Sequence, residues 1–209
     1  MTMDNHSKLP FVMWPDNEEE QKNALANSEQ LAEFQAYRSH ILPHKYTPKY
    51  HFWSPDGKLN DPNGLCFFNG KYHLFYQQYP HADPRQHWGH AVSDDMVHWK
   101  DLPTAIYPDP EYAVYSGNTL VENDGVIAMY HGFPIGNMVA KSTDPLLLNW
   151  QKLTNDAVIR WEEGVPYGVY DPFLWREDNG YYSLSGVSKK TVYGKRMSEQ
   201  LFYSQDLIH

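Results

Sequence analysis

The sequence predicts an all-β fold, because hairpin patterns recur along it and its composition favours strands. Apolar runs flank turn residues in LCFF-NG-KYHLFYQQY, NTLV-ENDG-VIAMYHG and PFLWRE-DNG-YYSLSGVS. Each of these pairs is typical of a β-hairpin with an Asn-Gly or Asp-Gly turn. The chain also contains 16 tyrosines and 7 tryptophans, and aromatic side chains are favoured in strands.

The hairpins belong to a longer repeat. Asp61, Ser116 and Asp171 open the three units and lie 55 residues apart. A third run closes each unit with a matched phrase, HAVSDDMVHW, MVAKSTDPLLLNW or LFYSQDLIH, and a fourth run follows in the first two units, at 102–108 and 153–159. Four short strands repeated about every 50 residues indicate a β-propeller blade. A propeller closes with about four to eight blades, so the two to three blades present here predict an incomplete ring.

A short helical segment precedes the repeat. Residues 16–40 are rich in acidic side chains at the start and carry Arg38 and His40 near the end, as a helix dipole favours. We therefore expect an N-terminal leader over 1–43 that contains a helix, followed by an incomplete β-propeller domain over 44–209.

Composition excludes several classes of function. The formal net charge of −9, with no basic stripe, argues against a nucleic-acid partner. No window approaches 18 apolar residues, so no membrane-spanning helix is expected. The N-terminus MTMDNHSKLPFVMW lacks a signal-peptide pattern, which favours a cytoplasmic location. The single cysteine, Cys66, lies in a strand-like run and is expected to be a buried thiol. The histidines show no ligand grouping, so neither a metal nor another cofactor is expected.

The repeat also predicts a catalytic site. Residues at the same phase of successive blades converge on one axial cavity, so Asp61, Ser116 and Asp171 are expected to lie close together. Two carboxylates in an aromatic-lined pocket are the arrangement that glycoside hydrolysis requires. The alternative is that both aspartates are turn or cap residues, since Asp-Pro commonly opens a turn and Asn-Gly before a strand commonly marks a hairpin.

Several segments together resemble a known family. HFWSPDGKLNDPNG, YHLFYQQYP, HWGHAVSDDMVHWKDLP, YSG and YDP are similar to the N-terminal catalytic domain of glycoside hydrolase family 32. These enzymes are β-fructosidases, such as invertases, levanases and inulinases, on a five-bladed propeller. The resemblance covers residues 44–209. It implies retaining hydrolysis of β-fructofuranosyl bonds in sucrose, fructooligosaccharides or fructans, with a fructosyl-containing carbohydrate as the binding partner.

The resemblance implies roles for individual residues. Asp61, in the NDPNG motif, matches the nucleophile, and Asp171 matches a transition-state stabiliser that hydrogen-bonds the sugar. Five further positions match substrate-binding residues, namely Asn60, Gln77, Trp88, Ser116 and Tyr170. Because a nucleophile must be ionised at working pH, we expect hydrogen-bond donors around Asp61.

The sequence departs from the family pattern at the pocket. Tyr170 stands where the family carries an arginine, which exchanges a charged fork of donors for one phenol hydroxyl. Lys58-Leu59 stands where many members carry Trp-Met. These changes leave open a related furanosidase of altered specificity.

The general acid is the largest departure. The family's acid is a glutamate in a Glu-Cys pair, and no such pair occurs here, so the acid is expected outside this chain. Glu111, Glu162 and Glu163 lie in predicted loops and are expected to be solvated surface residues instead. Two alternatives to a self-sufficient enzyme therefore stay open. The chain is a truncated propeller that binds sugar without catalysis, or it is one half of a split protein that needs a second chain to complete the ring.

Overall fold

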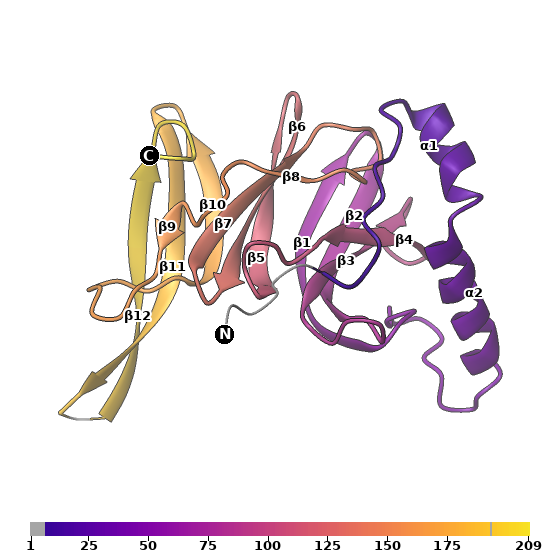
Figure 1. Cartoon of the computed structure of the whole chain (residues 1–209), viewed down its shortest axis with the longest axis horizontal. Coiled ribbons are helices and arrows are strands. Elements are labelled where there is room, and N and C mark those ends of the chain that lie inside the picture. The colour runs from indigo at the N-terminus through magenta and orange to yellow at the C-terminus, as the bar shows by residue number, and fades with distance from the viewer. Residues whose placement is uncertain (1–6, 193) are drawn as a thin grey trace.

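The computed structural model describes residues 7–192 and 194–209 and contains three antiparallel sheets that lie side by side (Figure 1). The first sheet has the order β1 (Lys58–Phe68), β2 (Lys71–Tyr79), β3 (His87–Ser93), β4 (Trp99–Ile106). The second has the order β5 (Ala113–Glu122), β6 (Gly125–Phe133), β7 (Gly136–Ser142), β8 (Gln151–Lys152), with β9 (Ile159–Arg160) also paired to β7. The third has the order β10 (Tyr170–Glu177), β11 (Gly180–Thr191), β12 (Gly194–Ser204). The predicted all-β fold of propeller type is confirmed, and these three sheets do not close a ring.

The innermost strands hold the sheets together. β5 contacts β1 on one side and β10 on the other. The Thr119 hydroxyl donates to the Gly64 carbonyl at 2.9 Å, and Leu174 exchanges hydrogen bonds of 2.7 and 2.9 Å with the amide of Asn118. Gly64 has φ of +58°, and a Cβ there would lie 3.1 Å from the Thr119 side chain and 3.2 Å from the Trp88 ring, so the backbone conformation and the tight packing both favour glycine.

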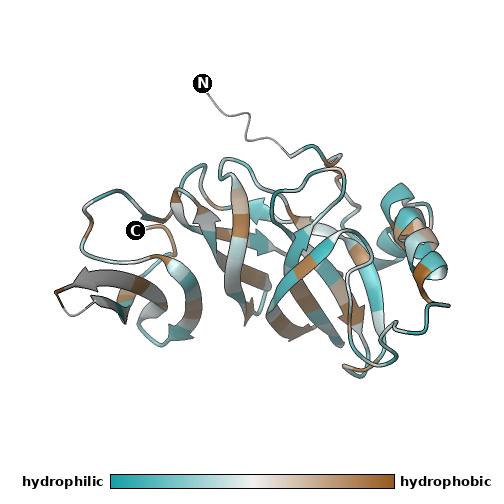
Figure 2. Ribbon diagram, turned by 90° about the horizontal axis from the view of Figure 1, so that it is seen from below, coloured by the Kyte–Doolittle hydropathy of each residue, from teal (hydrophilic) through white to brown (hydrophobic). Residues whose placement is uncertain are grey.

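The largest core cluster lies between the first and second sheets. It contains large side chains that are almost entirely buried, among them Phe75, Trp88, Tyr130 and Met138. Figure 2 shows hydrophobic residues along the strands and hydrophilic residues along most of the loops. The single thiol, Cys66, is buried in this cluster as expected, and burial raises its pKa to about 11.

The fourth run of the second unit differs from the prediction. A strand was expected over 153–159, but β8 ends at Lys152 and β9 begins at Ile159. Between them, the Thr154 hydroxyl donates to the Asp156 carbonyl at 2.5 Å and the Asp156 carboxylate accepts from the backbone N–H of Ala157 at 2.8 Å. The Asn-Asp pair therefore forms a turn, because short polar side chains compete with sheet pairing for backbone hydrogen bonds.

The helical leader consists of two helices rather than one. α1 (Glu18–Leu25) and α2 (Glu29–Ile41) are separated at Ser28, whose hydroxyl accepts from the Leu31 N–H and caps α2. Both helices lie beside the first sheet (Figure 1). The Arg38 guanidinium of α2 donates to both carboxylate oxygens of Asp101 in β4, at 2.5 and 2.7 Å. The first six residues of the predicted leader lie outside the described residues. Among the described helices, none is long and apolar enough to cross a membrane.

Candidate active site

Each innermost strand is irregular at the position where the sequence predicted a site residue. The pairing register shifts around Asp61 in β1, around Ser116 in β5 and around Asp171 in β10. Asp171 also has φ of +46°, which is uncommon for a residue with a side chain. Irregularities of this kind redirect side chains out of the regular alternation. The NDPNG motif therefore lies inside a bulged strand.

A chain of hydrogen bonds ends on Asp61. The Gln77 side-chain oxygen accepts from Asn60 Nδ2 at 2.7 Å and from Gln86 Nε2 at 2.6 Å. Because two donors face this oxygen, the Gln77 NH₂ group faces Ser116 and donates to its Oγ at 2.7 Å. The hydroxyl proton of Ser116 is then left to donate to Asp61 Oδ2, at 3.0 Å. Ser116 is thus a donor of the kind expected around Asp61.

The two aspartates come from strands on either side of β5. Partial removal from water raises the pKa of Asp171, and the charge of Asp61 raises it further. The two carboxylates are therefore electrostatically coupled, with Ser116 on the strand between them. Two carboxylates near each other stabilise positive charge that develops on a substrate bound beside them.

Tyr170 belongs to a row of aromatic rings beside this site. Its ring lies 5.3 Å from that of His131, which lies 5.5 Å from Tyr115, and Tyr115 stacks on Phe133 at 5.4 Å. Tyr170 is 46% exposed, whereas His131 is buried and has its pKa lowered to about 4 by that burial. The rings of this row belong to β5, β6 and β10. The side chain at the position of the family's arginine is therefore an uncharged aromatic ring.

Trp88 does not have the location predicted for it. It is completely buried, and its ring packs against Phe75 at 5.8 Å and Tyr130 at 5.6 Å instead of facing a sugar. The indole N–H donates to the Tyr115 carbonyl at 2.9 Å. A strand buried on both faces places this tryptophan in the core, where it supports the backbone directly before Ser116.

Glu111 also differs from its prediction. It was expected to be solvated, but it is completely buried, accepts a hydrogen bond from the Tyr130 hydroxyl at 3.0 Å and forms an ion pair with Lys152. The sequence did not indicate this ion pair because Lys152 lies 41 residues away from Glu111. Glu162 and Glu163 are exposed as expected, and Glu162 lies 3.5 Å from Arg160.

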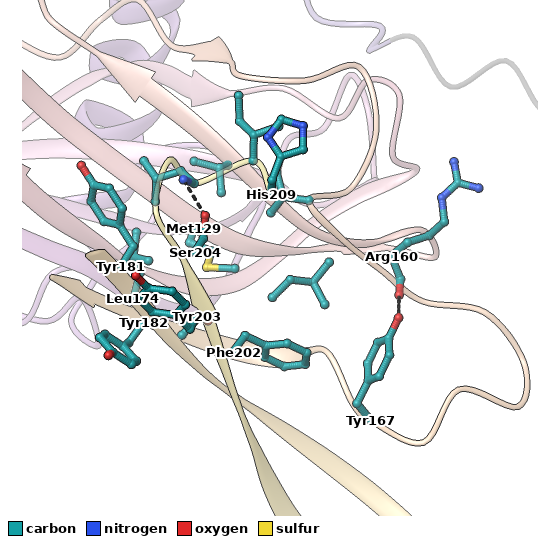
Figure 3. Close-up of a pocket in the computed structure, with 16 residues that line it drawn as sticks. Met129, Arg160, Tyr167, Leu174, Tyr181, Tyr182, Phe202, Tyr203, Ser204 and His209 are labelled. Carbon is teal, nitrogen blue, oxygen red and sulfur yellow. Dashed lines mark hydrogen bonds between the residues drawn. The ribbon is translucent and has the colours of Figure 1, made fainter. Parts of the chain in front are cut away.

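Gln86 is a site residue that the sequence analysis missed. It is 7% exposed and helps to fix the orientation of the Gln77 amide. Its position directly before the HWGH segment was the available signal. Neither the pocket between the second and third sheets (Figure 3) nor the pocket beside Tyr107 and Lys152 is lined by Asp61 or Asp171. Among the described residues, no group of three or more His, Cys, Asp or Glu side chains is placed to hold a metal.

Comparison with known proteins gives the family. The model of the glycosyl hydrolases family 32 N-terminal domain matches residues 51–209. The chain belongs to glycoside hydrolase family 32. It is 35% identical over 185 residues to a sucrose-6-phosphate hydrolase of Klebsiella pneumoniae, an alignment that covers 79% of this chain and 37% of that protein. It is also 43% identical over 90 residues to a levanase of Bacillus subtilis strain 168, which covers 42% of this chain and 13% of the levanase.

Solved structures of the family agree with the fold. The sucrose-6-phosphate hydrolase of Lactobacillus gasseri matches with a TM-score of 0.69 and 28% identity, over 92% of this chain and 41% of that one. A Bombyx mori β-fructofuranosidase of family 32, in complex with sucrose, matches with a TM-score of 0.68 and 28% identity, over 87% of this chain and 41% of that one. The chain therefore spans about two fifths of the length of these relatives, as the N-terminal part of the family's propeller.

Proposed function

We propose that this family 32 chain carries the nucleophile and the transition-state stabiliser of a retaining β-fructofuranosidase. Its substrates are sucrose, fructooligosaccharides or fructans. The observation that carries the proposal is the directed hydrogen bond from Ser116 to Asp61, whose polarity is set by Gln77. A turn or cap residue does not need a carboxylate oxygen bound by a serine hydroxyl that the buried amides of Gln77 and Gln86 orient.

The geometry supports a division of roles within Asp61. Ser116 occupies Oδ2, which leaves Oδ1 to attack the anomeric carbon of the fructosyl unit. A C–O bond forms to Asp61 while the bond to the leaving oxygen breaks, and the ring passes through an oxocarbenium-like state. Asp171 binds the sugar hydroxyls more tightly as positive charge develops, which is the differential binding that accelerates a reaction.

The coupling of the two aspartates changes during the reaction. Asp61 loses its charge when it becomes the fructosyl ester, so the repulsion that raises the pKa of Asp171 is removed. The pKa of Asp171 is then lower in the intermediate than in the free protein. This keeps a negative group beside the anomeric carbon when water later releases the sugar.

Whether this chain alone can cleave a substrate depends on whether the leaving group needs a proton. Cleavage of sucrose needs a proton for the departing oxygen, and the buried ion pair of Glu111 and the exposed positions of Glu162 and Glu163 do not suit them to that role. β-Fructofuranosyl fluoride needs much less acid assistance, because fluoride leaves as an anion. We therefore expect the 209-residue chain to release fluoride from this reagent and to leave sucrose intact.

Fluoride release measured with an ion-selective electrode tests the proposal. The Asp61→Asn variant is expected to lose release by at least a hundredfold, and Asp171→Asn by at least tenfold. Asp124→Asn, which alters an exposed aspartate in a hairpin turn, serves as the matched control and should behave as the unmodified chain. Equal rates for the unmodified chain and Asp61→Asn contradict the assignment. Binding of fructose without any fluoride release favours the non-catalytic sugar-binding alternative.

Altered specificity is a narrower proposal, and the half-exposed Tyr170 beside His131 favours it. A neutral phenol at this position offers one hydroxyl where arginine offers five N–H donors. We expect Tyr170→Arg to raise fructosyl-donor use relative to other furanosides, with Tyr170→Phe as the control that removes only the hydroxyl. An unchanged ratio of donor rates in Tyr170→Arg counts against this proposal.

A further inference from the structure

The strand that carries the proposed nucleophile begins with an unpaired cation. Lys58 is the first residue of β1, three residues before Asp61, and it pairs across the sheet with Tyr79 at the end of β2. The Lys58 ammonium lies 5.1 Å from the centroid of the Tyr79 ring, where the electrons of the ring face attract a cation. Among the residues that the structure describes, no carboxylate lies within ion-pair distance of Lys58. Its charge can therefore be used by a ligand.

The turn before Lys58 is fixed against the end of β2. Gly57 has φ of +61°, and a Cβ there would lie 1.8 Å from the Tyr79 carbonyl oxygen, so this close approach requires glycine. The Ser54 hydroxyl donates to the Asp56 carbonyl at 2.6 Å, and the Asp56 carboxylate lies 2.6 Å from the ring of His81. Asp56, the carboxylate nearest to Lys58 in the sequence, thus pairs with histidine instead. Lys58 extends from a backbone held at both ends.

Tyr79 connects Lys58 to the candidate active site. Burial raises the pKa of Tyr79, and the charges of Tyr115 and Asp61 raise it further. The Tyr79 hydroxyl is therefore within electrostatic reach of the nucleophile, and the Lys58 ammonium lies over the same ring. Lys58 and Asp61 are both exposed, so one substrate molecule can reach both side chains from solution.

Lys58 lies beyond the groups that surround the reacting carboxylate. Asn60, Gln77 and Ser116 form the hydrogen-bonded relay that ends on Asp61. Three residues of extended chain span up to about 10 Å, so Lys58 begins well outside this relay. A substrate whose anomeric carbon is at Asp61 meets Lys58 with the part beyond the fructosyl ring, which is the leaving group.

The charges elsewhere in the site disfavour an anionic substrate. The chain has a formal net charge of −9, and Asp61 and Asp171 are both acidic. Tyr170 adds no positive charge at the position of the family's arginine. Lys58 stands where many family members carry tryptophan, so a flat apolar side chain is replaced by an ammonium group. A compact cation with three N–H donors suits a phosphate group rather than a neutral sugar face.

We propose that Lys58 is a specificity-determining residue that selects fructosyl donors whose leaving group carries a phosphate ester. This selection rests on the proposed function of the Asp61 site and adds a class of substrate to it. The Lys58 ammonium pairs with the phosphate, while the Tyr79 ring supports the lysine from below. The pairing offsets the repulsion between the phosphate and the two aspartates.

Calorimetric titration with sucrose and with sucrose 6-phosphate, whose phosphate is on the glucosyl unit, tests the proposal. We expect the 209-residue chain to bind the phosphorylated sugar at least about tenfold more tightly, as a hydrogen bond to a charged group allows. Lys58→Met should bring the two affinities within about twofold, and Lys58→Arg should keep most of the difference because it keeps the charge. Equal affinities in the unmodified chain, or a difference that survives in Lys58→Met, overturn the proposal.

Lys100→Met is the matched control, because Lys100 is an exposed lysine on β4, the outermost strand of the same sheet. This variant should keep the full preference for sucrose 6-phosphate. Loss of the preference in Lys100→Met as well as in Lys58→Met would assign it to the net charge of the chain and refute a role specific to Lys58. Since Lys58 is exposed, the preference should also shrink as sodium chloride rises from about 50 to about 500 mM.

Two further ligands locate the phosphate. Sucrose 6′-phosphate carries its phosphate on the fructosyl unit and should gain no affinity from Lys58. If its affinity falls in Lys58→Met more than that of sucrose 6-phosphate, the lysine faces the fructosyl unit and the leaving-group assignment is wrong. Inorganic phosphate should bind at least about tenfold more weakly than sucrose 6-phosphate, because it lacks the sugar contacts. Equal binding of the two would identify an adventitious ion only and overturn the proposal.

These affinities are measured without turnover, so they are independent of the fluoride assay. Fluoride release that requires Asp61, together with a preference that Lys58→Met leaves unchanged, retains the nucleophile and refutes the role of Lys58. A preference that requires Lys58, in a chain that releases no fluoride, supports the phosphate contact and refutes the nucleophile.

Discussion

Replacing Glu111 by leucine is expected to lower the unfolding free energy by about 3–5 kcal/mol, because it leaves a buried lysine without its counter-charge. Glu111 is completely buried, and the Lys152 side chain is only 17% exposed. Burial lowers the pKa of Lys152, and the charge of Glu111 opposes this shift. Two backbone carbonyls, of Tyr107 and Asp109, also accept from the ammonium at 2.9 and 2.5 Å, which keeps the cost within this range.

A double-mutant cycle measures the coupling. Glu111→Leu, Lys152→Met and the double variant are unfolded in urea and followed by tryptophan fluorescence. We expect the double variant to cost at least about 2 kcal/mol less than the sum of the single variants, because it removes both charges together. For a chain of this size, the single variants should melt roughly 6–20 °C lower.

An exposed ion pair provides the control. Lys141 and Asp124 lie 2.7 Å apart at the surface, and Asp124→Asn should not change stability measurably because water screens that pair. If Glu111→Leu is as harmless as Asp124→Asn, then Glu111 is solvated and its assignment to a buried ion pair is wrong.

Three further predictions concern pH and packing. Because the folded pKa of Asp171 is raised, its ionisation opposes folding as pH rises above its ordinary value of 3.8, so Asp171→Asn should raise the melting temperature at pH 7 but not at pH 3. Burial lowers the pKa of His73 to about 4 and that of its neighbour His90 well below 6.5, so stability should fall as pH drops below 6.5. His90→Leu should reduce this dependence by about 1.4 kcal/mol per pH unit in urea titrations, and an unchanged slope refutes the role of His90. Trp150→Ala should cost about 3 kcal/mol, since it opens a cavity between the first two sheets, whereas a loss below about 1 kcal/mol would show that the indole is not packed there.

Much of the fold was predictable because the repeat is local and regular. The three hairpins follow from turn residues next to alternating apolar runs, and Asn69-Gly70 has positive φ at both positions, as a two-residue hairpin turn requires. The strand expected over 153–159 was wrong because Asn155-Asp156 bends the chain, and a short polar pair inside an apolar run is a weak signal from sequence alone.

The candidate site was predictable in its phase but not in its contacts. Equal spacing of 55 residues placed Asp61, Ser116 and Asp171 on neighbouring strands. Spacing does not report which face of a strand is buried, so Trp88 was expected at the sugar although it lies in the core. Partners distant in sequence, such as the lysine that pairs with Glu111, are equally invisible before the sheets are assembled.

The most direct test of the central claim is to map the covalent intermediate. The chain is incubated with β-fructofuranosyl fluoride, quenched in acid, digested and analysed by mass spectrometry. The nucleophile assignment predicts one fructosyl group per chain, on the peptide that contains Asp61, and no adduct in Asp61→Asn. An adduct on Asp171 or on any other residue, or an adduct that persists in Asp61→Asn, contradicts it.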